Sequence, residues 1–157
     1  MIGMPDIVVR LGVLTLVTVL LSLFAWSGQR FVEARRRQAL AAAPPGIFSE
    51  ISDGEVQSRP LVRILAFSSA NCHQCHQLQA PALKRVLEAR GTDVSVVDVD
   101  APDEPELAQR YQVLTVPTTV VLDAKGRAHA VNYGFANTVK LLEQVDEVVS
   151  AASSLYV

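Results

Sequence analysis

The sequence carries no excess of basic charge and very little cysteine. Its 157 residues include 14 Lys and Arg against 16 Asp and Glu, so the formal net charge is −2 at pH 7. Because there is no surplus of Lys and Arg to neutralise phosphates, nucleic acid is not an expected partner. Two cysteines are too few for a disulfide scaffold. A charged fraction of 19%, with 8 Gly and 8 Pro, excludes a disordered, collagen-like or coiled-coil chain.

The charge is unevenly distributed along the chain. At this length, one domain of ordinary size with an appendage is expected. Residues 1–46 contain five arginines against two acidic residues, a net charge of +3, which leaves −5 for the remainder. We therefore expect a basic, apolar N-terminal part followed by an acidic globular domain, residues 47–157.

An apolar segment of membrane-spanning length lies near the N-terminus. Residues 7–26 contain thirteen Leu, Ile, Val or Phe and one charge, Arg10. As a helix, 20 residues span roughly 30 Å, the thickness of a bilayer core, and the thirteen apolar residues favour insertion by roughly 4 to 8 kcal/mol. Arg10 is near one end, where its side chain can reach the headgroups. We predict a tail at residues 1–6 and a transmembrane helix at residues 7–27.

The flanks of this segment indicate how it is retained and oriented. A cleaved signal peptide is disfavoured, because no basic region precedes residue 7. Residues 28–46 form a basic juxtamembrane segment and Ala/Pro linker, in which Arg35, Arg36 and Arg37 can meet lipid headgroups. The positive-inside rule favours a cytoplasmic domain, and the extracytoplasmic side is the alternative.

The globular part alternates strand and helix patterns. Residues 61–67 are a nearly continuous apolar run, typical of a strand covered on both faces, and residues 94–99 are a second strand. Helical periodicity over residues 71–90 places four apolar side chains on one stripe: Leu78, Ala82, Val86 and Ala89.

The second half of this part continues the alternation. A short helix at residues 103–111 opens with a capping pair of Asp103 and Glu106. Strands at residues 118–122 and 128–133 form a hairpin, and a last helix begins near Asn137. The order is therefore βαβα, a hairpin and a final helix, which is an α/β fold.

The chemistry concentrates at Cys72-His73-Gln74-Cys75, where the first strand ends and a helix begins. Three residues apart in a first helical turn, two sulfurs face the same side and can close a disulfide with little backbone movement. Cys72 is at the helix N-terminus, where unpaired N–H groups and the helix dipole favour a thiolate. We predict Cys72 as the nucleophile and Cys75, one turn deeper, as the resolving thiol.

Over residues 56–149 the sequence resembles the thioredoxin superfamily. The resemblance rests on residues in several elements: Phe67, Cys72, Cys75, Pro81, Val97-Asp98-Val99-Asp100 and Val116-Pro117-Thr118. It implies a thioredoxin-like fold, a central mixed sheet flanked by helices, here preceded by one transmembrane helix. In that family the proline matching Pro117 is cis and packs against the redox pair. The backbone at Val116 would pair with an extended substrate segment, with Thr118 beside it.

The departures from the family pattern lie around the redox pair. Thioredoxins usually have Trp before the first cysteine and Gly-Pro between the two, where this chain has Asn71 and His73-Gln74. The buried Asp that helps to move protons to the resolving thiol is replaced by Ala66, and its Lys partner by Val96. These differences indicate a membrane-tethered relative with its own redox poise.

His73, Gln74 and His76 are the candidate tuning residues. A protonated imidazole near Cys72 would make the disulfide more oxidising, although both imidazoles could equally be uncharged surface groups. We predict a thiol-disulfide oxidoreductase whose redox group is the Cys72–Cys75 disulfide, with no metal or other cofactor. Its expected partners are protein or small-molecule disulfides and thiols, a redox recycling partner and membrane lipid.

Three other functions fit parts of the same pattern. Cys72 to His76 matches the CxxCH haem-attachment motif, which the strand-rich body and the predicted orientation oppose. Two thiolates with a distant imidazole would suit copper(I), but the copper branch of the family uses another cysteine spacing and no distal ligand is apparent. The third alternative is a non-catalytic docking module, favoured by the loss of the Asp and Lys equivalents.

Overall fold

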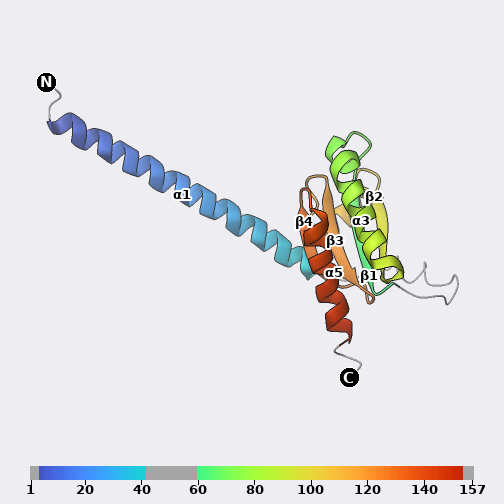
Figure 1. Cartoon of the computed structure of the whole chain (residues 1–157). Helices are drawn as coiled ribbons and strands as arrows, with labels where there is room; N and C mark the ends of the chain where they lie inside the picture. The colour runs from blue at the N-terminus through green and yellow to red at the C-terminus, as the bar shows by residue number, and fades with distance from the viewer. Residues whose placement is uncertain (1–3, 42–59, 154–157) are drawn as a thin grey trace. The chain divides into compact units, whose positions relative to one another are not determined.

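The computed structural model of the chain describes residues 4–41 and 60–153, which form two compact units divided between Arg35 and Arg36 (Figure 1). The predicted boundary at residues 46 and 47 and part of the predicted tail at residues 1–6 lie outside the described residues. Each unit is considered separately.

The N-terminal part is one continuous helix, α1 (Met4–Leu40). The predicted apolar span and the basic segment after it are thus successive parts of the same helix. From Arg10 to Leu40 the mean hydropathy reaches 2.0, and by length and composition this helix can cross a membrane. Its large apolar side chains from Leu11 to Val32 are exposed, with Phe24 at 81% and Leu21 at 64%.

Polar groups within the apolar stretch of α1 are satisfied by the helix itself. The hydroxyls of Thr15, Thr18 and Ser22 each donate to a backbone carbonyl three or four residues earlier, at 2.8 to 3.0 Å. Such internal pairing is what hydrocarbon surroundings demand, because no water is there to hydrogen-bond them. Where the helix becomes basic, Arg30 lies over the ring of Trp26, 4.7 Å from its centroid.

The second unit is built on a mixed four-stranded sheet with the order β2-β1-β3-β4. The strands are β1 (Val62–Ser68), β2 (Val94–Asp100), β3 (Thr118–Asp123) and β4 (Ala128–Tyr133). β1 pairs in parallel with β2 and antiparallel with β3, and β3 pairs antiparallel with β4. The predicted element order and the mixed sheet are confirmed, with strand ends shifted by about one residue.

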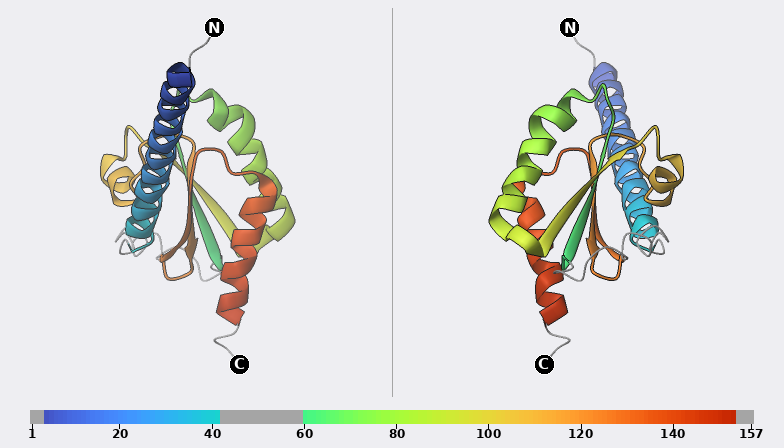
Figure 2. Two further views of the ribbon diagram at one scale, coloured as in Figure 1. Left: turned by 90° about the vertical axis from the view of Figure 1, so that its left-hand side faces the viewer. Right: turned by 90° about the vertical axis from the view of Figure 1, so that its right-hand side faces the viewer.

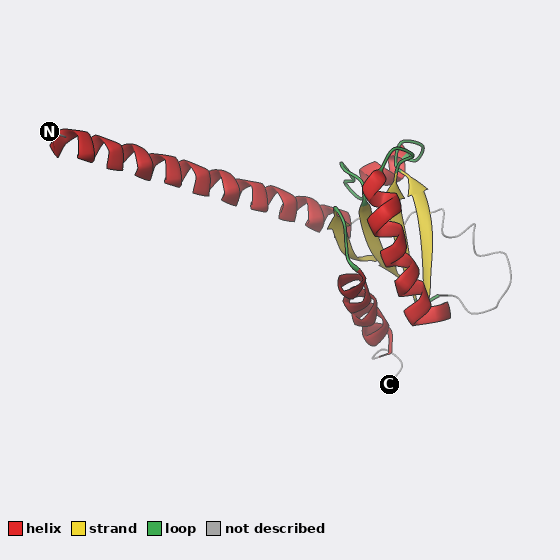
Figure 3. Ribbon diagram, turned by 45° about the horizontal axis from the view of Figure 1, so that its top comes forward, coloured by secondary structure: helices red, strands yellow, loops and turns green. Residues whose placement is uncertain are grey.

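Helices cover both faces of this sheet. Figure 2 shows α3 (Ala80–Arg90) and α5 (Thr138–Ser153) on one side and α4 (Pro105–Arg110) on the other; Figure 3 gives the same layers by element type. Because successive side chains of β1 alternate between faces, Ile64 packs in the core cluster under α3 and α5, while Leu65 packs in the cluster under α4. β1 is therefore buried on both faces, as its apolar run predicts.

A wide helical turn precedes α3. Residues Cys75–Gln79 form a π-helical turn, η2, in which the N–H of Ala80 bonds the carbonyl of Cys75 five residues back. Pro81 explains this turn, because it has no N–H to offer the carbonyl four residues earlier and its ring would collide with that carbonyl in a regular α-helix.

The π turn changes which side chains α3 buries. Its extra residue rotates the preceding turn relative to α3. The predicted stripe of Leu78, Ala82, Val86 and Ala89 is wrong at both ends, at Leu78 on this turn and at Ala89 near the end of α3. Leu78 is 47% exposed and Ala89 is exposed. The buried side chains are instead those of Cys75, Gln79, Ala82, Leu83 and Val86.

The predicted capping pair of Asp103 and Glu106 is also wrong. α4 starts only at Pro105, its N-cap is Glu104, and no side chain caps it. Asp103 lies in the preceding turn, where its N–H bonds the carbonyl of Asp100 at 3.2 Å. Proline at the first helical position determines the start, since its fixed φ suits a helix and its missing N–H is no loss there.

The β3–β4 hairpin is organised by one carboxylate. Asp123 accepts hydrogen bonds from the backbone N–H groups of Lys125 and Arg127, from Arg127 Nε and from His129 Nε2, at 2.8 to 3.3 Å. Gly126 supplies the positive φ of 77° that the turn needs. Burial raises the pKa of Asp123, but these hydrogen bonds outweigh it, so the pKa lies below its ordinary value.

We expect Asp123→Asn to lower the free energy of unfolding by about 1 kcal/mol at pH 7, because the ion pair and part of the hydrogen bonding are lost. Since the folded-state pKa is lowered, this contribution is complete above the unfolded-state pKa of about 3.9 and disappears as pH falls through the folded-state value. Urea unfolding of the detergent-solubilised chain between pH 3 and 7 measures it. Asp146→Asn, which breaks the more exposed pair with Arg90, is the control and should cost less; equal costs would contradict this account.

Candidate functional site

The strand register brings three loops to one end of the sheet. Phe67, near the end of β1, pairs with Thr118 at the start of β3, and Thr118 pairs with Tyr133 at the end of β4. The segments that follow β1, precede β3 and follow β4 therefore meet at this end. They contain the redox pair, Pro117 and residues 134–136, respectively.

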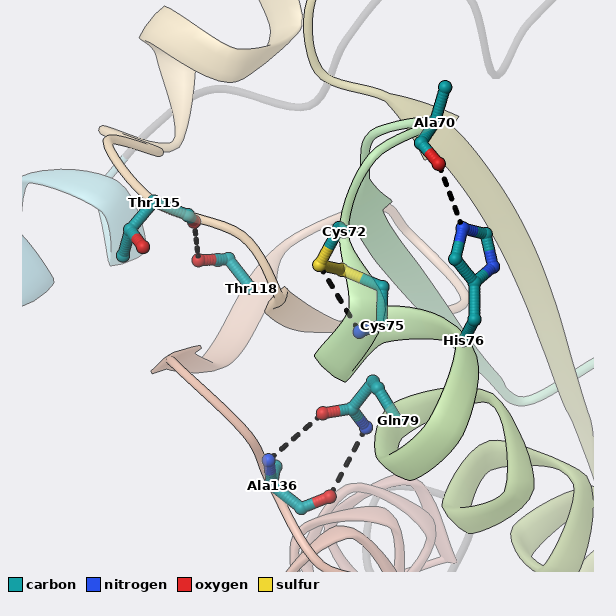
Figure 4. Close-up of a disulfide and its surroundings, with 8 residues drawn as sticks. All are labelled: Ala70, Cys72, Cys75, His76, Gln79, Thr115, Thr118 and Ala136. Carbon is teal, nitrogen blue, oxygen red and sulfur yellow. Dashed lines mark hydrogen bonds between the residues drawn. A yellow bond between two sulfur atoms is a disulfide. The ribbon is translucent and has the colours of Figure 1, made fainter.

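Cys72 and Cys75 form a disulfide at the start of the helical segment, with their Cα atoms 5.3 Å apart (Figure 4). Cys72 occupies the N-cap position: its carbonyl accepts from the N–H of His76 at 3.3 Å, and helical structure begins at His73. Its sulfur accepts from the backbone N–H of Cys75 at 3.1 Å. An N-cap Ser, Thr, Asp or Asn accepts the same hydrogen bond from the third helical residue through its side-chain oxygen. Here the acceptor is the Cys72 sulfur, the atom that would carry the negative charge of a thiolate.

The two cysteines differ in exposure. Cys72 is half-buried, whereas Cys75 is only 5% exposed. An incoming disulfide can therefore approach Cys72 but not Cys75. This asymmetry suits the roles of nucleophile and resolving thiol that the sequence predicts for them.

His73, Gln74 and His76 are exposed beside the pair. Figure 4 shows the ring of His76 turned toward Ala70, whose carbonyl oxygen is 3.3 Å from Nε2. The imidazole thus contacts the loop that leads into Cys72 and not a sulfur atom. The tuning roles of these three residues stay predictions.

The turn before β3 faces the same end of the sheet as the redox pair. The peptide bond between Val116 and Pro117 is cis, the isomer that the resemblance implies. Pro117 is buried and Val116 is half-buried. Thr118 is fully buried, and its hydroxyl donates to the carbonyl of Thr115 at 2.7 Å. The Thr118 side chain therefore braces this turn, and the substrate-binding roles of Val116 and Thr118 stay predictions.

Sequence reasoning missed Gln79. This side chain is 3% exposed, and its carboxamide makes two hydrogen bonds with the backbone of Ala136: Nε2 donates to the carbonyl at 3.1 Å, and Oε1 accepts from the N–H at 2.9 Å. A glutamine among the small and apolar residues of a buried helix face is the signal that could have identified it. The predicted stripe concealed that signal, because it placed Leu78 on the buried face and left its neighbour Gln79 off that face.

Neutral polar side chains lie beside Ala66, the position at which thioredoxins have a buried Asp. Ala66 pairs with Thr119, which pairs with Asn132, so the three form a row across the sheet. Asn132 Nδ2 donates to Thr119 Oγ1 at 3.1 Å and to Gln144 Oε1 at 2.8 Å, and Gln144 returns a hydrogen bond at 3.0 Å. None of these buried side chains can ionise, so this row cannot take a proton from Cys75.

Metal ligation is not evident in the part of the chain that the structure describes. No three His, Cys, Asp or Glu side chains are grouped there in a way that could hold a metal ion. The residues that the site brings together, two cysteines, a cis-proline turn and a backbone-binding glutamine, suit sulfur exchange along a polypeptide.

Comparisons with known proteins agree with this geometry. Residues 50–147 match the family model described as Thioredoxin. The thioredoxins of Mycobacterium tuberculosis and Mycobacterium bovis are 29% identical to the chain over 86 residues, which is 55% of this chain and 72% of each relative. Chloroplastic thioredoxin z has a TM-score of 0.53 at 25% identity, covering 67% of this chain and 90% of its own. A mutant thioredoxin from Halobacterium salinarum has a TM-score of 0.51 at 26% identity, covering 64% and 83%.

The unequal exposure of the sulfurs predicts unequal alkylation. After reduction, we expect limiting iodoacetamide to label Cys72 at least about tenfold faster than Cys75, because reactivity follows thiolate character and access. Peptide mass spectrometry measures the two rates. Protein unfolded in guanidinium chloride is the control, in which the rates should converge. Equal labelling of the folded protein would contradict the assignment.

Proposed function

Since this chain belongs to the thioredoxin family, we propose that it is a membrane-tethered thiol-disulfide oxidoreductase that uses Cys72 and Cys75. The observation that carries the proposal is the half-buried Cys72 sulfur at a helix N-terminus, bonded to the N–H of Cys75 and joined to a buried second sulfur. This arrangement stabilises a nucleophilic sulfur and keeps its resolving partner one bond away.

The exchange balances as a two-electron transfer. In the reduced protein the Cys72 thiolate attacks one sulfur of a substrate disulfide, the substrate S–S bond breaks, and the other substrate sulfur leaves as a thiolate that takes up a proton. Cys75, once deprotonated, then attacks the Cys72 sulfur of the mixed disulfide and releases the second substrate thiol. The pair ends as the disulfide, and a dithiol partner must reduce it before the next cycle; the reverse sequence oxidises a substrate.

The turn before β3 is the proposed contact for a polypeptide substrate. Within the described residues, the backbone N–H and C=O of Val116 have no backbone hydrogen-bond partner. They can therefore pair with an extended segment on either side of its cystine, as an added strand pairs with a free sheet edge. Proteins with accessible disulfides or thiols are the expected substrates, and small disulfides can reach Cys72 as well.

The tether is proposed from the composition of α1. Its exposed apolar side chains and self-satisfied hydroxyls suit hydrocarbon, and the arginines that follow Trp26 suit anionic headgroups. Those arginines favour the cytoplasmic side for the redox domain by the positive-inside rule.

Cysteine variants test the exchange. In the full-length chain, we expect Cys72→Ser to abolish the catalysis of insulin reduction by dithiothreitol. Reduced Cys75→Ser, mixed with insulin after dithiothreitol has been removed, should accumulate a mixed disulfide, because the second thiol of the pair is missing. Non-reducing electrophoresis and mass spectrometry detect that adduct. Activity retained by Cys72→Ser would contradict the proposal and favour a docking role.

Charge placed within the span tests the tether. The double substitution Leu16→Arg and Leu20→Arg should add about 5 to 7 kcal/mol to the cost of insertion and release the chain into the soluble fraction at alkaline pH. Phe31→Arg, outside the predicted span, is the control and should leave the chain in the membrane. A wild-type chain that is itself extracted would contradict the tether.

Labelling of Cys72 by an impermeant maleimide in intact cells would overturn the cytoplasmic assignment.

A further inference from the structure

Gln79 holds together two segments that are 57 residues apart. Its two hydrogen bonds use both the donor and the acceptor of Ala136, which is fully buried. Figure 4 shows this pair next to the helical turn that carries Cys75. Leaving either backbone group unpaired in this interior would cost about 1 to 3 kcal/mol. The carboxamide therefore fixes where the segment after β4 lies relative to the redox helix.

The segment that contains Ala136 is also hydrogen-bonded to the cis-proline turn. Gly134, two residues before Ala136, donates its backbone N–H to the carbonyl of Pro117 at 2.9 Å. Gly134 has a φ of 85°, a backbone conformation that residues other than glycine rarely adopt. The bend at this position therefore favours glycine. A continuous path thus runs from Cys75 through Gln79, Ala136 and Gly134 to Pro117.

Val116, beside Pro117, and Phe135, within residues 134–136, belong to segments that meet at the same end of the sheet as Cys72. Val116 is half-buried and Phe135, between Gly134 and Ala136, is 45% exposed. A polypeptide that presents its disulfide to Cys72 must fit against both segments, whereas a small disulfide needs only the exposed face of the sulfur.

Packing alone does not require a glutamine at this position. The other buried side chains of the redox helix are Cys75, Ala82, Leu83 and Val86, and an apolar side chain would fill the space without the desolvation cost of an amide. The polar side chain is explained by the backbone groups that it binds.

We propose that Gln79 is a positioning residue for polypeptide substrates, which keeps residues 134–136 and the Pro117 turn in place relative to the redox pair. This inference rests on the proposed thiol-disulfide exchange. Gln79 contacts neither sulfur, so its loss leaves the reactivity of Cys72 unchanged and loosens only the surface against which a polypeptide docks.

The test compares Gln79→Leu with Gln144→Leu in the full-length chain in detergent. Gln144 is the matched control, because it is also a buried glutamine with carboxamide hydrogen bonds, but it binds Asn132 and not the loop. We expect Gln79→Leu to lower the rate of reduction of insulin disulfides about tenfold, since small misplacements of a binding surface are costly. The rate with a small aromatic disulfide should change less than about twofold. Gln144→Leu should change the ratio of the two rates by less than about twofold.

Gln79→Glu covers the case in which the leucine variant fails to fold. The carboxylate keeps the bond from the Ala136 N–H but cannot donate to its carbonyl, so the insulin rate should fall while the small-disulfide rate is retained. An equal fall in both rates, or no fall in either, would overturn the proposal.

Hydrogen exchange separates this inference from the activity itself. The N–H groups of Gly134 and Ala136 should lose protection in Gln79→Leu and keep it in Gln144→Leu; unchanged protection at Gly134 would overturn the coupling. Should the wild-type chain exchange no disulfide at all, the proposed function fails, while loss of protection at Gly134 still reports the physical link.

Discussion

One hydrogen bond, from the backbone N–H of Cys75 to the sulfur of Cys72, is the interaction on which the site depends. The sulfur at the N-cap shares the N–H of Cys75 with the Cys72 carbonyl, which accepts from the same group at 3.1 Å, and it lies at the positive end of the helix dipole. The same geometry puts the second sulfur one turn deeper, where it is shielded from solvent yet within bonding distance of the first. In the proposed exchange, the positions of the two cysteines in the helix favour Cys72 for attack and Cys75 for resolution.

The sheet makes this helix end useful. β1 is buried on both faces and delivers Cys72 to the end of the sheet where β3 begins and β4 ends. Pro117 and residues 134–136 are brought there by strand pairing. The interior under the redox helix is neutral at Ala66, Thr119 and Asn132, where a family member would usually hold an acid. A proton leaving Cys75 must therefore reach solvent by another route.

Whether the sequence could predict a feature of this site depends on how far apart along the chain the interacting residues lie. The CxxC spacing, the apolar run of β1 and the Val116-Pro117-Thr118 motif are local patterns, and they identified the fold and the redox pair. The π turn at Cys75–Gln79 was not foreseen, because the effect of Pro81 on the preceding turn shifts a periodicity that was read as uniform. Gln79 was missed for the same reason, and its partner Ala136 is distant in sequence. Asp103 failed as a cap because Pro105 sets the start of α4.

The protein combines an apolar helix suited to a bilayer with a thioredoxin-family domain, and we propose that its two sulfurs act as one redox unit. Equilibration of the full-length chain with glutathione buffers of graded composition, followed by alkylation and mass spectrometry, tests this most directly. We expect both thiols to appear together in a single two-electron transition with a midpoint between about −120 and −270 mV, the range of catalytic dithiols. A disulfide that stays closed at the most reducing ratios, or two thiols that titrate separately, would contradict it.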